Sequence, residues 1–207
     1  MTPPAATPLV LLISAPSGGG KTTVCEQFLA TRPGITRAIT CTTRAPRPGE
    51  RPGIDYHFLE PEDFARRVAA GEFLEHANVY GRSYGTLKSE LLDRLAAGRD
   101  VLLNIDVQGA ATVRVTAARD PILARALVTI FLTPDSLDTL EARLRRRGQD
   151  AEETIQRRLA AARGEIAQWR EFDYLVVSTT IPADLAAVEA IYTAERMRVV
   201  RSAPPLG

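Results

Sequence analysis

A glycine-rich segment near the start of the chain runs directly into a lysine and two threonines, since residues 14–23 read SAPSGGGKTT. The backbone N–H groups of such a turn point inward and form a concave site for phosphate oxygens. The Lys21 ammonium can reach the β- and γ-phosphates of a nucleoside triphosphate, and the Thr22 hydroxyl can bind Mg²⁺. The segment predicts a phosphate-binding loop, and it does not say which molecule accepts the phosphate.

Ala15 stands where the phosphate-loop pattern has a glycine. Glycine is required there only if φ is positive or if a Cβ would collide with the phosphate chain. Alanine serves where neither condition holds. We therefore expect the whole loop to bind the triphosphate, through Ala15, Pro16, Ser17, Gly18, Gly19, Gly20, Lys21, Thr22 and Thr23.

Two further segments carry arginines at spacings that suit phosphate. Arg44 and Arg47 lie three apart in TCTTRAPRPGE (residues 40–50), and Tyr56 follows. Each guanidinium group can bind two phosphate oxygens at once, so two arginines and a tyrosine hydroxyl suit a monophosphate. A solvated basic loop has the same pattern. Residues 143–163 are dense in arginine with Gly148 in the middle, which is typical of a charged helical hairpin.

The elements that position these segments alternate along the chain. Short apolar runs predict strands at 9–14, 35–41, 100–106, 127–132 and 174–177, and helical patterns follow them. This alternation predicts an α/β fold with a parallel sheet covered by helices on both faces. Residues 42–87 break the rhythm and suggest a small mixed-sheet insertion around a helix at 61–70 that Gly71 ends.

Composition limits the classes of function. A net charge of +1 over 207 residues argues against a protein that coats nucleic acid. No apolar run approaches the roughly 18 residues of a membrane span, and the first residues lack the basic start of a signal peptide. Cys25 and Cys41 fit a reducing cytoplasm, and His57 and His76 lack a third ligand for zinc. We expect a cytoplasmic protein with small-molecule partners.

The chain resembles the guanylate kinase family in motifs that follow the family order over nearly the whole length. These are SAPSGGGKTT, TTRAPRPGE with G-x-x-Y-x-F, FLEH (73–76), YGT (84–86), NIDVQG (104–109), RLRRRG (143–148) and EETIQRRL (152–159). The resemblance implies the reaction ATP + GMP → ADP + GDP with Mg²⁺, dGMP as a second acceptor, and a monomer or homodimer. It also implies a phosphate-loop core (1–41, 88–142 and 170–207), a GMP-binding domain (42–87) and a lid (143–169).

The resemblance also implies roles for individual residues. Catalysis falls to Lys21, Arg47, Arg147 and Arg158, and the last two close over the triphosphate. The metal site is Thr22, with Asp106 acting through water. The GMP site comprises Thr40, Arg44, Arg47, Glu50, Tyr56, Glu75, Tyr84, Gly85, Thr86, Asn104 and Asp106.

Glu75 is chemically complementary to guanine. Guanine presents two adjacent donors, N1–H and the 2-amino group, and a carboxylate offers two parallel acceptors. Adenine has an acceptor at N1 and would leave the carboxylate unpaired, which is a large penalty in a polar site. Hydroxyls of Thr40 and Thr86 can donate to guanine O6.

Two positions depart from the family pattern, and two other readings stay open. Asn104 stands where the family has aspartate, and Ser178-Thr179-Thr180 stands where it tends to have Asn-Asp. The chain can be an active guanylate kinase, a related binding module without catalysis, or a phosphate-loop enzyme with another acceptor. The retained lysine and arginines disfavour the second reading, and Glu75 with TTRAPRPGE disfavours the third.

Overall fold

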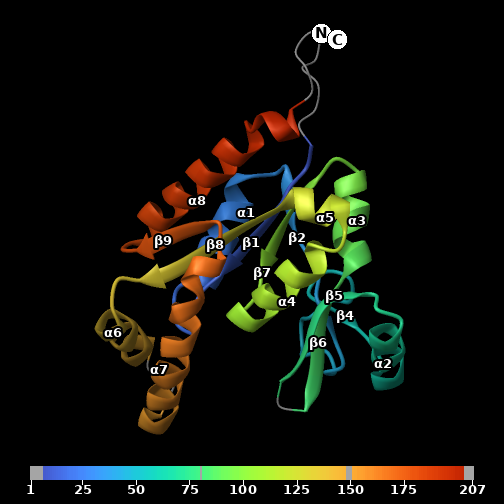
Figure 1. Cartoon of the computed structure of the whole chain (residues 1–207). Coiled ribbons are helices and arrows are strands. Elements are labelled where there is room, and N and C mark those ends of the chain that lie inside the picture. Colours follow the sequence, from blue (N-terminus) through green and yellow to red (C-terminus); the bar gives the residue numbers. More distant parts are fainter. Residues whose placement is uncertain (1–6, 80, 148–150, 203–207) are drawn as a thin grey trace.

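The central sheet of the protein has five parallel strands, in the order β2-β7-β1-β8-β9 (Figure 1). The computed structural model describes residues 7–79, 81–147 and 151–202, without the side chains of Val79 and Arg147. The strands are β1 (Val10–Ser14), β2 (Ile35–Arg37), β7 (Asp100–Asn104), β8 (Leu127–Pro134) and β9 (Tyr174–Ser178). The predicted α/β fold with a parallel sheet is confirmed.

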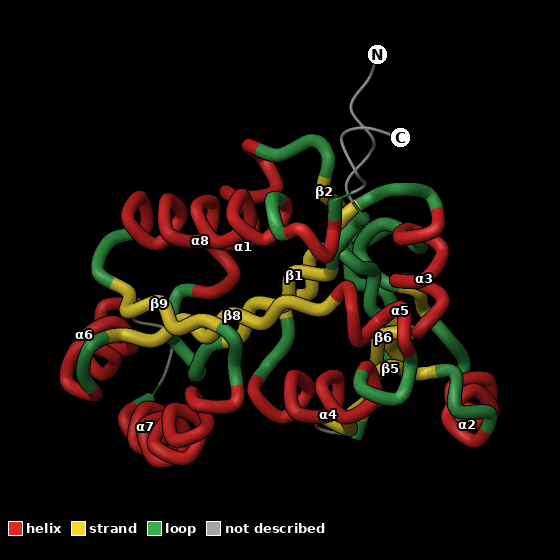
Figure 2. The backbone as a smooth tube through the Cα atoms, turned by 45° about the horizontal axis from the view of Figure 1, so that its top comes forward, coloured by secondary structure: helices red, strands yellow, loops and turns green. Residues whose placement is uncertain are grey.

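Helices cover both faces of this sheet (Figure 2). Leu11 and Ile13 of β1 point into one apolar layer with α1 (Lys21–Thr31) and α8 (Ile181–Arg196). Val10 and Leu12 point into the opposite layer, with α3 (Lys88–Ala96), α4 (Val107–Ala117) and α5 (Pro121–Ala126). Because every residue of β1 is buried, this strand reads as a continuous apolar run. No described helix is long and apolar enough to cross a membrane.

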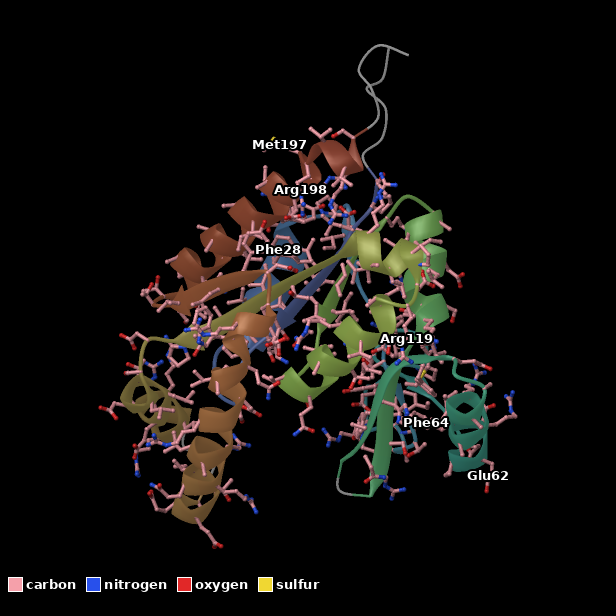
Figure 3. All side chains as sticks on the ribbon, viewed as in Figure 1. Phe28, Glu62, Phe64, Arg119, Met197 and Arg198 are labelled. Atoms are coloured by element: carbon pink, nitrogen blue, oxygen red, sulfur yellow. The ribbon has the colours of Figure 1, made fainter. Side chains whose placement is uncertain are left out.

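A second sheet has four strands in the order β4-β3-β6-β5. These are β3 (Cys41–Thr42), β4 (His57–Phe58), β5 (Phe73–Val79) and β6 (Arg82–Leu87), and the helix α2 (Pro61–Ala69) packs beside them. Phe64, labelled in Figure 3, belongs to α2. Its ring stacks on that of Phe73, with centroids 4.4 Å apart. Gly71 has a φ of 67° and ends the helix segment as predicted.

The predicted strand at 35–41 is wrong, because the chain changes sheets within it. Ala38 N–H still donates to the carbonyl of Leu102 in the central sheet, at 2.9 Å. Cys41 then pairs with Gly85 of β6 in the second sheet. Both halves of the segment mix apolar residues with threonine, so periodicity alone does not mark where the chain leaves one sheet for the other.

Glu90 of α3 holds the second sheet against the core. Its carboxylate accepts a hydrogen bond from Ile39 N–H at 2.6 Å, on the connection that enters the sheet. Its other oxygen lies 3.6 Å from His57 Nε2 on β4. Arg94 also bonds Glu90, and it reaches back to the carbonyl of Arg37 at 3.1 Å. This polar cluster therefore holds the connection from β2 to β3, at residues 38–40, against α3, the helix that directly follows β6.

A pair of helices, α6 (Leu137–Arg147) and α7 (Glu152–Ile166), extends from the same end of the central sheet as the second sheet (Figure 1). The pair packs through Leu140, Leu144, Ile155 and Ala162. The predicted charged hairpin is present in this form, although α6 begins before the arginine-rich segment and Gly148 lies outside the described residues. Short 3₁₀ turns follow at Ala167–Glu171 and Val199–Arg201.

Asp100 at the start of β7 ties three distant parts of the core together. The carboxylate is buried, and it accepts hydrogen bonds from Leu9 N–H at 2.8 Å, Tyr192 O–H at 2.5 Å and Arg196 at 2.5 Å. Burial and the nearby carboxylate raise the pKa of Tyr192 to about 12. Helix α8 is thus fixed to the chain immediately before β1, the strand that leads into the phosphate loop.

We expect Asp100→Ala to lower the free energy of unfolding by about 3 kcal/mol, because it leaves a buried hydroxyl and a cation without their partner. Urea denaturation followed by circular dichroism measures the loss. The matched control is Asp93→Ala at an exposed position of α3, which should change stability by less than about 0.5 kcal/mol. Equal stability of the two variants would contradict the tethering role.

Candidate active site

The phosphate loop connects β1 to α1 at the carboxyl end of the central sheet. Gly18 and Gly20 have φ values of 90° and 93°, which glycine adopts without strain, and Gly19 N–H closes a turn on the Pro16 carbonyl at 2.9 Å. A Cβ on Gly18 would lie 2.7 Å from Leu144 Cδ2. Helix α6 therefore packs directly on the loop, and the bare glycine makes room for it.

Ala15 departs from the loop pattern for a reason that the structure supplies. It is buried in the apolar layer that also holds Leu11 and Val24. A Cβ on Gly19 would already lie 3.0 Å from the Ala15 methyl. The Ala15 methyl therefore adds to the core, and it leaves little room for a side chain at position 19.

Lys21 occupies the first turn of α1, and its ammonium faces the end of β7. Nζ donates a hydrogen bond to the Ile105 carbonyl at 2.5 Å. Burial lowers the pKa of Lys21, and the nearby groups of Cys25, Asp106 and Glu165 act in the opposite direction. Glu165 belongs to α7, and its Oε2 accepts a hydrogen bond from Ser17 N–H in the loop at 3.1 Å. A carboxylate from the helical pair thus lies in the phosphate site.

Three adjoining clefts run across this end of the molecule. The first, about 660 Å³, is lined by the predicted loop residues 15–23 together with Asp106 and Glu165. The second, about 690 Å³, shares Gly18, Gly20 and Thr23 with the first and extends to residues 178–181. The third, about 390 Å³, shares Asp106 with the first and extends to the second sheet. The clefts form one track whose centre is the phosphate loop.

The third cleft brings together predicted acceptor residues from both sheets, namely Thr40, Tyr56, Glu75, Tyr84, Asn104 and Asp106. The Glu75 carboxylate is buried, and the Thr86 hydroxyl donates to its Oε1 at 2.8 Å. Burial raises the pKa of Glu75, the hydrogen bond from Thr86 lowers it, and the charge of Asp106 raises it. Glu75 Oε2 has no hydrogen bond to a described residue, and Oε1 can accept one more besides that from Thr86, so both oxygens can accept from a ligand.

Gly85 is required beside Glu75 by close approach of the backbone. A Cβ at this position would lie 2.8 Å from the Glu75 carbonyl oxygen and 2.8 Å from the Phe73 ring. Such contacts are shorter than packed side chains tolerate. The predicted site residue Gly85 therefore contributes space rather than a functional group.

Arg44 and Arg47 lie in different environments. Glu50 accepts two hydrogen bonds from the Arg44 guanidinium, at 2.8 and 3.0 Å, and one from the backbone N–H of Arg47 at 2.7 Å. These bonds lower the pKa of Glu50. The Arg44 guanidinium also lies 5.5 Å from the centre of the Tyr56 ring. Tyr56 lines the third cleft. The Arg47 side chain is exposed and has no polar contact with another described residue.

The second cleft shows how the loop after β9 is held. Arg143 of α6 donates to Ser178 Oγ at 2.9 Å and to the carbonyls of Ser178 and Thr179. The buried Asp184 accepts from the Ser178 hydroxyl at 2.6 Å and from Thr179 N–H at 3.1 Å. Sequence reasoning missed Asp184, whose only signal is its place in the first turn of α8.

The two predicted lid arginines are on the helical pair. Arg158 is half-buried on α7. Arg147 is the last residue of α6, and its side chain lies outside what the structure describes. Their approach to a phosphate stays a prediction.

The sequence matches a known family of proteins. Residues 6–195 fit the sequence model of the family described as guanylate kinase. The chain belongs to the guanylate kinase family. The known activity of guanylate kinases is ATP-dependent phosphorylation of GMP, so the family consists of nucleotide-binding transferases.

Similar guanylate kinases cover almost the whole chain. That of Paramagnetospirillum magneticum is 44% identical over 190 residues, which is 92% of this chain and 86% of the relative. That of Thiobacillus denitrificans is 43% identical over 201 residues, or 97% and 93%. The crystal structure of guanylate kinase from Anaplasma phagocytophilum superposes with a TM-score of 0.72 at 31% identity, covering 98% and 93%.

The guanylate kinase reaction implies Mg²⁺, and the first cleft offers oxygen ligands that suit it. Thr22 is exposed there beside Asp106. Asp106 Oδ1 caps α4 by accepting from Gly109 N–H at 2.7 Å, while Oδ2 has no hydrogen bond to a described residue. The described residues hold no cluster of three or more His, Cys, Asp or Glu suited to a metal. This donor set fits an ion that keeps phosphate and water ligands.

The two cysteines are free thiols and lie in the core near the phosphate loop and in the second sheet. Burial raises the pKa of Cys25 to about 12 and that of Cys41 to about 11. Both thiols are therefore neutral near pH 7, and the thiolate that covalent catalysis needs is absent.

We expect both thiols to react with iodoacetamide at pH 8 at least about a hundredfold more slowly in the native protein than in the urea-unfolded chain. Mass spectrometry of alkylated peptides measures the two rates, and the unfolded chain is the control. Rapid labelling of native Cys25 or Cys41 would contradict the burial of these groups.

Proposed function

We propose that this chain transfers the γ-phosphoryl group of ATP to GMP, giving ADP and GDP. The observation that carries the proposal is the track of three clefts, in which a donor site and an acceptor site adjoin at the phosphate loop and Asp106. Phosphoryl transfer requires two bound substrates in line and positive charge between them. Membership of the guanylate kinase family supports the same reaction.

The proposed division of labour has three parts. Residues 1–41, 88–142 and 170–207 form the core that binds ATP, residues 42–87 bind GMP, and residues 143–169 form the lid. The separate four-stranded sheet supports the second part and the α6–α7 pair supports the third.

At the donor site, the loop N–H groups receive the phosphates and Lys21 neutralises the β- and γ-phosphates. Thr22 and, through water, Asp106 would hold Mg²⁺, which supplies charge neutralisation on the transferring phosphate. The second cleft, beside Arg143 and Ser178, has room for the adenine and ribose, and we assign them to it.

At the acceptor site, Arg44, Arg47, Tyr56 and Tyr84 bind the GMP phosphate. Glu50 keeps Arg44 in position beforehand, while the exposed Arg47 is free to move onto the phosphate. Glu75 accepts from guanine N1–H and the 2-amino group. The Thr86 hydroxyl already donates its hydrogen bond to Glu75. We therefore assign guanine O6 to Thr40, and we propose that Thr86 orients the carboxylate.

Closure of the lid completes the site. Arg147 and Arg158 then join Lys21 and Arg47 around the transferring phosphate, and water, the competing acceptor, is excluded. The contacts proposed for GMP involve base and phosphate, so dGMP is a second acceptor. We place the enzyme in purine nucleotide metabolism in the cytoplasm, where GMP is recycled, as a monomer or homodimer without nucleic-acid or membrane partners.

A coupled ADP-release assay across GMP, dGMP, AMP, CMP and UMP tests the function. We expect turnover with GMP and dGMP, much less with the other acceptors, and loss of turnover when Mg²⁺ is chelated. No turnover with any acceptor would favour a binding module, and turnover with AMP but not GMP would overturn the assigned specificity.

We expect Glu75→Gln to raise the KM for GMP about a hundredfold, because an amide group then opposes a guanine donor. The dissociation constant for ATP should be unchanged, as titration calorimetry will show. The control is Glu62→Gln on the exposed face of α2, which should behave as the wild type (Figure 3).

The pH dependence provides a second readout of Glu75. Burial raises its pKa, so the carboxylate takes up a proton at a higher pH than an exposed glutamate. The wild-type KM for GMP should therefore rise as the pH falls through this raised pKa, while Glu75→Gln should lack the acid limb. A flat wild-type profile down to pH 4.5 would exclude the carboxylate from base recognition.

A further inference from the structure

Glu165 is a polar residue in the phosphate site that the family motifs leave without a role. It lies in the last turn of α7 and lines the first cleft together with the phosphate loop. Its Oε2 accepts a hydrogen bond from Ser17 N–H, across 148 residues of sequence. The carboxylate also acts on Lys21, whose pKa it raises against the effect of burial. It therefore bonds to the loop and places a negative charge in the cleft that Lys21 also lines.

The contact joins the lid to the loop at a second point. Helix α6 already packs on Gly18 through Leu144. Glu165 adds a bond from α7, so each helix of the pair has its own attachment to the loop. Ser17 precedes Gly18 and Gly20, the glycines whose left-handed backbone shapes the phosphate loop. With the phosphates on the N–H groups from Gly18 onward, the Ser17 N–H stays with Glu165.

Helix geometry connects this attachment to a proposed catalytic arginine. Arg158 and Glu165 are seven residues apart on α7, which is two turns, so they lie on one face about 10 Å apart along the helix. Ala162 lies between them on the same side and is buried against α6. A helix fixed at Glu165 therefore fixes the rotation and the reach of Arg158.

We propose that Glu165 is a positioning residue, whose bond to Ser17 N–H anchors α7 on the phosphate loop and so aligns Arg158 with the transferring phosphate. The inference rests on the proposed kinase function. The anchor persists while ATP is bound, because the Ser17 N–H precedes the N–H groups that receive the phosphates. Misplacement of a catalytic group by about 1 Å lowers turnover strongly, which is why an anchor far from the chemistry matters.

Three substitutions separate anchoring from charge. Glu165→Gln keeps an oxygen that accepts from Ser17 N–H and loses the charge. Glu165→Asp keeps the charge and is too short to reach. Glu165→Ala loses both. Glu153→Ala is the matched control, since this exposed glutamate on the same helix has no side-chain hydrogen bond or ion pair with another described residue.

The readouts are kcat with GMP and the dissociation constant of ATP with Mg²⁺. We expect Glu165→Ala and Glu165→Asp to lower kcat about tenfold, and Glu165→Gln to stay within about threefold of wild type. ATP affinity should change less than about threefold in all variants. The proposal is overturned if Glu165→Ala matches Glu153→Ala, if the aspartate variant is active and the glutamine variant is not, or if ATP binds tenfold more tightly to the alanine variant.

Hydrogen exchange tests the anchor without turnover. Amide exchange over residues 159–166 in the free protein should quicken in the alanine and aspartate variants and stay at the wild-type rate with glutamine. Unchanged exchange in Glu165→Ala would overturn the anchor. A wild-type protein that fails to phosphorylate GMP would instead refute the proposed function, so the two failures are distinguishable.

Discussion

The half-buried ammonium of Lys21 is the constraint around which the rest of the site is arranged. A cation that loses water must be compensated by nearby acceptors, or it gives up its proton. The Ile105 carbonyl, Asp106 and Glu165 supply this compensation from the end of β7, the start of α4 and the end of α7. These elements converge because the parallel strands end at the same edge, so the sheet determines where the charge can lie.

Much of this arrangement could be predicted from the sequence. Apolar runs predicted β1, β7 and β8 closely, because strands buried on both faces leave a continuous pattern. The loop was predictable because Lys21 and Thr22 follow the glycines at fixed spacing. Thr40, Tyr56, Glu75, Tyr84, Asn104 and Asp106 do line one cleft, as the family motifs implied.

Other features could not be predicted, for physical reasons. Glu165 is a single glutamate on a charged helix, and its contact with Ser17 exists only once α7 is folded against the loop. The direction of the Thr86 hydroxyl depends on its neighbour Glu75 rather than on a motif. The break within residues 35–41 leaves no mark in hydrophobic periodicity, since both sheets accept the same residue types.

The way the second sheet is attached has an evolutionary consequence. In the described part of the chain, it joins the core through two short connections, at residues 38–40 and 87–88, and Glu90 holds them together. The groups proposed to choose the acceptor lie between these connections, apart from Thr40, Asn104 and Asp106. One continuous stretch of gene therefore encodes most of the residues proposed to choose the acceptor, and it can diverge or be exchanged while the part proposed to bind ATP is inherited unchanged.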